Sequence, residues 1–359
     1  MAVFRSPVAL AILGAALAVT LAPGEDPVAA LGHRIEQGAA QLRFDPVYGY
    51  LPSLLEALHV PVESQMAVFS KTSIQLLRIE PSNPRVLYFN DSVAVGWVSG
   101  GFIELAAQDP ALGMQYYTLQ QRPDERLTRR EVCLRCHTSG AALLHSVVSA
   151  PDGIPSNEAD VDSRTPFRKL WGGWFVTGNA VPAVHMGNAV FAGSARRELT
   201  PSLDPKIALT PSSDVVALMV FAHQIHMMNL LAHPDNVNEL ADYLLFMDEA
   251  PLPAPIRGSS GFAEKFSSAG PRDHKGRSLR EFDLQDRLMR YRCSYMIYTE
   301  AFDALPAATK AAVYRRMWRI LSGEATGARP FSPDDRNAVV EILRDTKKDL
   351  PEYFQPLSR

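Results

Sequence analysis

Two cysteines and a histidine form the most reactive cluster in the chain, in the pentapeptide Cys133-Leu134-Arg135-Cys136-His137. Thiols spaced in this way can add to the two vinyl groups of one porphyrin, and the adjoining imidazole can bind its iron. The C-x-x-C-H pattern therefore predicts one covalently attached haem c. Cys133 and Cys136 would be the anchors and His137 the proximal ligand of the iron.

A C-x-x-C pair also occurs in zinc sites and in redox-active disulfides. A zinc site needs a second pair of ligands, and the only other cysteine, Cys293, has no neighbouring thiol. A thioredoxin-like dithiol follows a buried strand, whereas Arg129, Arg130 and Glu131 precede this motif. Both alternatives are weaker than haem attachment, and Cys293 is expected to be a buried structural thiol.

The ligand on the distal side of the iron distinguishes an electron carrier from an enzyme. An iron whose distal position is filled by a side chain transfers electrons, whereas an iron whose distal position is free can bind a substrate. His185 is the preferred distal candidate, and Met186, His223 and His226 are the alternatives. His223 and His226 are three residues apart, which places them on one face of a helix. Each of these side chains has a plainer interpretation as a packed core residue. His145 follows the motif too closely to reach the distal side easily.

Basic residues gather around the motif. Arg130 and Arg135 are candidates for binding the haem propionates or an acidic redox partner, and Arg126 and Arg129 lie beside them. A solvated basic surface is the alternative interpretation.

The N-terminus has the layout of a secretory signal. Arg5 precedes an apolar stretch over residues 8–22 that contains no charge, and Pro23, Gly24 and Glu25 follow. We expect a signal peptide over residues 1–22, whose cleavage could extend to residue 30. An apolar stretch of about 15 residues falls short of the roughly 20 needed to span a bilayer. The mature chain is therefore expected in the bacterial periplasm, without a stable membrane span.

Composition sets further limits. With 359 residues, of which 47% are hydrophobic and 21% charged, the chain can bury a sizeable core. A formal net charge of −3 gives no electrostatic footprint for nucleic acid, so nucleic acid is not expected as a partner.

Short β-rich stretches precede the motif, separated by turn residues such as Asn90-Asp91 and Gly100-Gly101. They predict a small antiparallel β-meander at about residues 70–120. Its strands are expected at 73–79, 85–89, 93–98, 102–105 and 115–119. The segment 150–211 is rich in Gly, Pro, Asn and Ser, but its aromatic residues argue for an ordered loop that wraps over the haem.

Helical patterns dominate elsewhere. A pair of short helices is expected over 27–58, and longer helices over 215–231, 237–247, 278–302, 307–321 and 332–346. Residues 257–277 are expected to form a flexible linker. The predicted fold class is α+β, mainly α, with the meander packed on a helical haem region. The predicted parts are a haem-binding region at 31–255 and a C-terminal helical region at 278–359, packed on the same core.

The chain resembles a group of secreted bacterial proteins that carry a single c-type haem motif. The resemblance lies in the C-x-x-C-H motif and in several short segments spread over most of the mature chain. These are residues 68–73, 87–91, 96–98, 117–119, 171–178 (WGGWFVTG), 185–188 (HMGN), 223–224 and 293–295. The resemblance implies haem c and periplasmic placement but supplies no reaction. Such relatives carry a histidine where this chain has Met228, which leaves an extra metal site on that helix in doubt.

Three functions are compatible with these features. The first is a periplasmic monohaem cytochrome that passes single electrons to a redox partner protein. The second is a peroxidase-like haem c oxidoreductase with an open distal face, which would use a histidine as acid or base. The third is a haem-based gas sensor or a structural haem protein.

Overall fold

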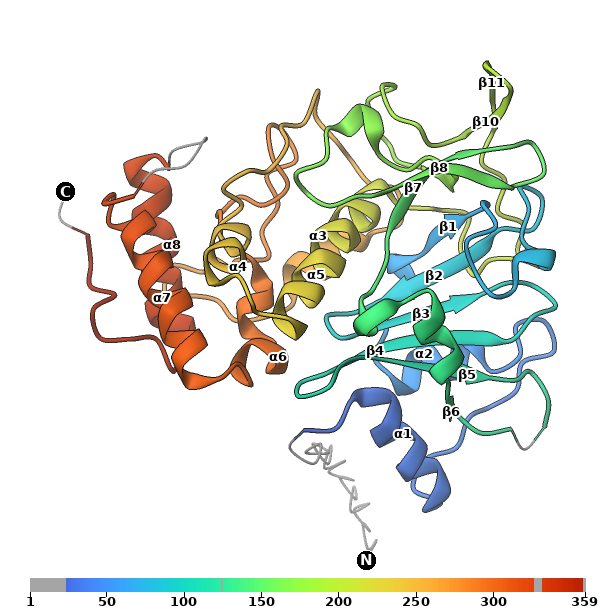
Figure 1. Ribbon diagram of the computed structural model, residues 1–359, viewed down its shortest axis with the longest axis horizontal. Coiled ribbons are helices and arrows are strands. Elements are labelled where there is room, and N and C mark those ends of the chain that lie inside the picture. Colours follow the sequence, from blue (N-terminus) through green and yellow to red (C-terminus); the bar gives the residue numbers. More distant parts are fainter. Residues whose placement is uncertain (1–23, 124, 326–330, 358–359) are drawn as a thin grey trace, which may run out of the picture.

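The computed structural model describes residues 24–357 except 124 and 326–330, and a seven-stranded antiparallel sheet forms its centre (Figure 1). The strands lie in the order β6-β5-β4-β3-β2-β1-β9, so β2 to β6 follow the chain order and β9 joins at the far edge. Their bounds are β1 Met66–Val68, β2 Arg85–Phe89, β3 Val93–Trp97, β4 Ile103–Asp109, β5 Gly113–Leu119, β6 Thr128–Arg129 and β9 Trp174–Phe175. Two hairpins lie apart from this sheet. They are β7 (His145–Ser149) with β8 (Pro155–Asp160), and β10 (Ala189–Ala192) with β11 (Ala195–Glu198).

One face of the sheet packs against the N-terminal helices α1 (Pro27–Glu36) and α2 (Leu51–Ala57). Alternate residues of the strands supply this face, including Val86, Tyr88 and Val95, because successive side chains of a strand point to opposite sides. Asp26 caps α1 by accepting the backbone N–H groups of Val28 and Ala29.

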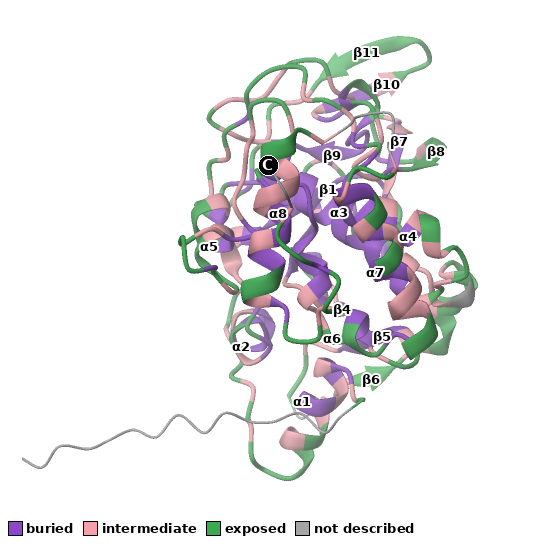
Figure 2. Cartoon of the chain, turned by 90° about the vertical axis from the view of Figure 1, so that its left-hand side faces the viewer, coloured by how far each residue is buried: buried purple, intermediate pink, exposed green. Residues whose placement is uncertain are grey.

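The other face packs partly against α3 (Val215–Ala232), which is buried along most of its length (Figure 2). Asp214 caps this helix, and the ring of Phe221 lies 4.9 Å from the ring of Phe89 on β2. By length and composition α3 could cross a membrane, but 78% of its residues are buried inside the protein. The apolar sequence of α3 is explained by its place in the core.

The remaining helices pack against α3 or against one another. They are α4 (Val237–Leu244), α5 (Phe262–Ser268), α6 (Glu300–Asp303), α7 (Ala307–Leu321) and α8 (Pro333–Thr346). One hydrophobic cluster runs from Met66 on β1 to Leu343 on α8. The residues of the predicted haem-binding and C-terminal regions thus share a core. Six short 3₁₀ helices complete the described elements: Val62–Ser64, Leu76–Arg78, Glu131–Arg135, Thr138–Gly140, Phe167–Lys169 and Tyr295–Tyr298.

The prediction of a mainly helical fold with a small meander is wrong. Helices hold 31% of the described residues and strands 18%, and the sheet is the centre to which the helices are added. The first three residues of the C-x-x-C-H motif lie in a 3₁₀ turn, and Cys136 and His137 follow it, so the motif is not in an α-helical region. Strands as short as β1, β6 and β9 carry no readable alternation, since their place is decided by pairing with strands distant in the sequence.

Most predicted elements are confirmed. Four of the expected strands are β2 to β5, and the helices expected at 215–231, 237–247, 307–321 and 332–346 are α3, α4, α7 and α8. The short helices expected within 27–58 are α1 and α2. The expected loop over 150–211 contains β8, β9 and the β10–β11 hairpin, and its aromatic residues Trp171, Trp174 and Phe175 are buried.

Two predicted elements are wrong. The strand expected at 73–79 is replaced by a 3₁₀ turn, because the amide of Gln75 bonds both the N–H and the carbonyl of Phe102. The long helix expected at 278–302 is mostly irregular. There the Asp283 carboxylate accepts the N–H groups of Gln285 and Asp286, and Leu284 takes the left-handed conformation with a φ of 55°.

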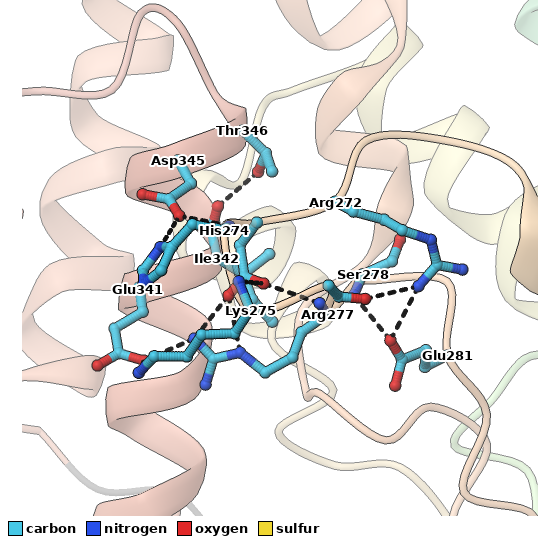
Figure 3. Close-up of polar contacts among 12 residues, drawn as sticks. Arg272, His274, Lys275, Arg277, Ser278, Glu281, Glu341, Ile342, Asp345 and Thr346 are labelled. Carbon is cyan, nitrogen blue, oxygen red and sulfur yellow. Dashed lines mark hydrogen bonds and ion pairs between the residues drawn. The ribbon is translucent and has the colours of Figure 1, made fainter.

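The expected flexible linker at 257–277 is also wrong. It contains α5, and its last residues are tied to α8 by the contacts drawn in Figure 3. Arg277 bonds the buried Asp273 at 2.7 Å and reaches Glu341 on α8 at 2.6 Å. His274 pairs with Asp345, and Lys275 lies 2.7 Å from Glu341. The two carboxylates of α8, Glu341 and Asp345, are four residues apart and hold the basic residues of this segment in place.

Replacing the buried carboxylate of this network should destabilise the fold. Burial by itself raises the pKa of Asp273, but its bonds from Arg277 outweigh this and hold the pKa below its usual range. Asp273→Asn should lower the free energy of unfolding by about 2–3 kcal/mol at pH 7, the scale of bonds to a charged group. The charged form stabilises the fold above the unfolded-state pKa, so the difference from wild type should shrink as the pH falls below about 4. Urea unfolding at several pH values measures this. The control Lys275→Gln, at an exposed pair, should lose less than about 1 kcal/mol.

Candidate functional site

The C-x-x-C-H motif begins in the 3₁₀ turn Glu131–Arg135, which follows the edge strand β6. Cys136 and His137 come after this turn and before a second one, Thr138–Gly140. The Arg130 N–H donates to the Tyr116 carbonyl at 2.8 Å, which fixes the start of the turn to β5. Figure 1 shows this green segment in front of the sheet. The sheet thus positions the motif, and it does so on the same face that α3 covers in part.

Backbone hydrogen bonds close the turn that carries Cys133, Cys136 and His137. The Cys133 carbonyl accepts the N–H groups of Cys136 at 3.2 Å and His137 at 3.0 Å. Both cysteines are free thiols, Cys133 half-buried against the core and Cys136 exposed. Burial raises the pKa of Cys133, and the neighbouring Glu104 carboxylate raises it further. Cys136 is therefore the more accessible of the two cysteines.

The imidazole of His137 is oriented from two sides. Its ring stacks on Tyr116 with centroids 4.4 Å apart and planes 27° from parallel. Its Nδ1 lies 2.9 Å from the Ala141 carbonyl oxygen, which also accepts the Tyr116 hydroxyl at 2.8 Å. When Nδ1 carries the proton and donates it, Nε2 keeps its lone pair, which is the arrangement that metal-bound histidines use. Burial lowers the pKa of His137, which favours the neutral form that can bind a metal.

Charged residues of the sheet border the motif. Arg85 on β2 reaches Glu104 on β4 at 2.7 Å, across Gly96 of the strand between them. Glu104 also accepts the Ser73 hydroxyl at 2.7 Å, whereas the Nε of Arg85 is buried without a hydrogen-bond partner. Arg85 lowers and Glu104 raises the pKa of His137, so both charges act on this imidazole.

The sequence did not single out Tyr116, Arg85 or Glu104. In the sheet register Tyr116 lies opposite Ala106, and Glu104 lies opposite Thr118 and Gly96. The alternation of residues along the strands shows that these side chains lie on one face of the sheet. That the C-x-x-C-H motif lies over the same face depends on tertiary structure.

The two candidate arginines differ in their surroundings. Arg130 donates from Nε to the Thr118 hydroxyl at 2.8 Å and is half-buried beside the motif. Arg135 lies within the motif and is exposed. Arg126 and Arg129 are exposed as well, and Arg126 lies 3.8 Å from Glu36 on α1.

The preferred distal candidate, His185, lies among the aromatic residues of the 150–211 segment. Its ring meets Trp171 at 5.8 Å and Phe167 at 6.3 Å between centroids, and its Nδ1 is buried without a partner. Burial lowers the pKa of His185, and Arg196 lowers it further. The Met186 sulfur lies 4.0 Å from the Ser146 hydroxyl.

The histidine pair of α3 divides into two different environments. His223 is fully buried, stacks on Tyr243 and Phe246, and bonds Ser294 through Nε2 at 2.7 Å. Burial lowers the pKa of His223 to about 3, so it stays neutral. His226 accepts from Arg164 at 2.9 Å and lies 3.7 Å from Asp162 and from Glu239.

The contacts found for the distal candidates in the described part of the chain are with residues outside the motif. The candidates therefore occupy separate places, with His185 beside Trp171 and His223 and His226 on α3. Over the described ranges, no group of three or more His, Cys, Asp or Glu side chains could hold a metal ion. A haem iron differs from such a site because the porphyrin supplies four of its ligands.

One histidine that the sequence set aside lies within electrostatic range of the motif. His145, at the start of β7, lowers the pKa of His137. Its two ring nitrogens lie 3.3 Å from Glu158 and 2.9 Å from Asp160, both on β8. Its position in the sequence, eight residues after His137, gave no sign of this, because the chain turns back at Gly140 with a φ of 74°.

Comparisons with protein-family models, with curated proteins and with solved structures found no match to this chain. The resemblance to secreted monohaem proteins therefore remains a prediction from the motifs. What the site can do rests on its own geometry.

The Tyr116 ring should control the protonation of His137. In the protein without haem, we expect His137 to titrate below about 6.5, the ordinary value for histidine, because its ring is buried against Tyr116. Tyr116→Ala should raise the pKa of His137 toward that value, whereas Tyr116→Phe keeps the ring and should keep most of the shift. Histidine-selective NMR titration measures both. A wild-type pKa at or above 6.5 would contradict the described packing.

Proposed function

We propose that this chain is an exported monohaem c protein that transfers single electrons to a redox partner. The observation that carries the proposal is the arrangement of Cys133, Cys136 and His137. The half-buried Cys133 and the exposed Cys136 lie one turn apart, and the imidazole of His137, the next residue, is already oriented by the Ala141 carbonyl.

The donor set fits a covalent haem. Each thioether forms when the sulfur of Cys133 or Cys136 adds to one carbon of a vinyl group and the proton goes to the other. This step needs no oxidant or reductant. His137 would bind the iron through Nε2, with the Ala141 carbonyl and the Tyr116 ring fixing its orientation. The haem would supply a reversible one-electron couple.

The surrounding charge fits the propionates. The buried Nε of Arg85 has an unused N–H donor, and an unpaired buried donor of this kind costs about 1–3 kcal/mol. Arg130 and Arg135 supply further donors beside the turn. Arg85 and Arg130 are therefore proposed to hold the propionates, and the exposed Arg135 to contribute to docking.

The exposure of the motif supports electron transfer. Cys136 is exposed, and Val132 and Leu134 on either side of Cys133 are 47% and 43% exposed. A haem attached here would have an edge near the surface, with apolar and basic side chains around it. These are the features of a docking area for an acidic partner protein.

One observation keeps the peroxidase-like oxidoreductase as a second candidate. His185, Met186, His223 and His226 have packing partners of their own, so the structure assigns none of them to the distal side of His137. If none of them binds the iron, its sixth position is open to a small oxidant. His145, flanked by Glu158 and Asp160, would then be a candidate acid or base.

Covalent haem is the first test. The protein, exported in a host with c-type cytochrome maturation, should carry one haem that resists acid-acetone extraction and gives a c-type pyridine haemochrome spectrum. Cys133→Ala together with Cys136→Ala should abolish covalent attachment, while Cys293→Ala should not. A wild-type protein without covalent haem would sink the proposal.

The spectrum of the reduced protein with and without carbon monoxide separates the two candidates. An electron carrier with both axial positions filled should be low-spin and unchanged by carbon monoxide, whereas an open site should be high-spin and shift. His185→Ala should convert low-spin to high-spin if His185 is the distal ligand. Met186→Leu and His223→Gln are the matched comparisons. An unchanged low-spin spectrum in His185→Ala removes His185 as a ligand.

A further inference from the structure

A cavity of about 310 Å³ lies away from the haem motif, between the β2–β3 turn and α5. The rings of Phe89, Phe262 and Phe266 line it. A volume of this size falls at the lower end of the range for small-molecule sites, which are mostly apolar with a few placed polar groups.

Arg280 supplies a buried positive charge to this cavity. Its side chain is 9% exposed, and its guanidinium carbon lies 4.5 Å from the ring centroids of both Phe266 and Tyr295. Gly270 packs directly against it, where any side chain would come within 2.9 Å of Nε. The guanidinium is thus held rigidly by its neighbours, before any ligand arrives.

The donors of Arg280 are only partly used. Among the hydrogen bonds found in the described residues, its guanidinium makes one, from Nη2 to the Asp91 carboxylate. A guanidinium has five N–H donors in a flat fork that matches a carboxylate. Arg280 lines the cavity together with the aromatic side chains.

The present partner of Arg280 is easily displaced. Asp91 is 43% exposed and lies on the β2–β3 turn, where Asn90 accepts the N–H groups of Ser92 and Val93. Its carboxylate can rotate into water without opening the core. At the rim, Lys265 adds a second cation, bound to Glu63 at 3.0 Å.

We propose that this cavity binds a small carboxylic acid with an apolar body. The ligand carboxylate replaces Asp91 on the fork of Arg280, and the body packs against Phe262 and Phe266. A partially buried guanidinium favours an anion over a neutral ligand, and the aromatic walls favour a ring or a short chain over a sugar. The site is independent of the haem proposal.

Binding of phenylacetate to the full-length protein, measured by isothermal titration calorimetry, tests the proposal. Phenylacetamide has the same shape without the charge and should bind at least about tenfold more weakly, because it loses the charge-assisted pair. Arg280→Gln should weaken phenylacetate binding by at least about tenfold. Arg290→Gln is the matched control and should leave binding unchanged, because that side chain is 61% exposed and lies outside the cavity.

Asp91→Asn keeps the test valid even if the Arg280 variant fails to fold. Removing the competing carboxylate should tighten phenylacetate binding several-fold, which a purely structural Arg280–Asp91 pair would not do. Equal binding of the acid and the amide would overturn the proposal. So would weaker binding in Asp91→Asn, or no binding of phenylacetate at millimolar concentration.

Discussion

The central constraint in this molecule is that its sheet must be covered on both faces, and that α3 covers the second face only in part. The helices α1 and α2 close the first face. On the second, α3 lies over Phe89, and Gln108 bonds the carbonyl of Met228 on this helix. On the strands beside β2, Ala94 and Ala106 lie in the same row as Phe89 and remain half-buried, as does Glu104 farther along β4. Because α3 covers this face incompletely, functional groups can lie at both of its ends.

The motif segment lies where α3 stops covering the sheet. β6 pairs with β5, and the turn that follows brings His137 onto Tyr116. The side chains of Ala94, Gly96 and Ala106 are small and leave room above β3 and β4. A segment with its own functional groups can therefore lie over these strands. The sheet therefore serves as the rigid support for the imidazole, while the thiols stay near the surface. A site supported by strands holds its geometry more closely than one supported by loops alone.

An arginine pairs with a carboxylate near each end of the β2–β3 hairpin, and the two pairs are similar. Arg85 pairs with Glu104, and Arg280 pairs with Asp91 on the turn. Each guanidinium is mostly buried beside a single carboxylate and retains donors that this carboxylate does not use. Burial of a guanidinium is costly unless its donors are satisfied, so such side chains are suited to bind anions that arrive later. In the two proposals these anions are a haem propionate and a small carboxylic acid.

The sequence by itself determined the reactive group and most of the regular elements. The order Cys133, Cys136, His137 is local, and so are the alternation in β2 to β5 and the cap of α3 at Asp214, because each depends on residues a few positions apart. Tertiary structure alone decided what meets at the site. Tyr116 against His137, Arg85 across Gly96 and Arg280 between two rings all join residues distant in the chain. Such contacts follow from the packing of whole elements, which no local pattern of residues encodes.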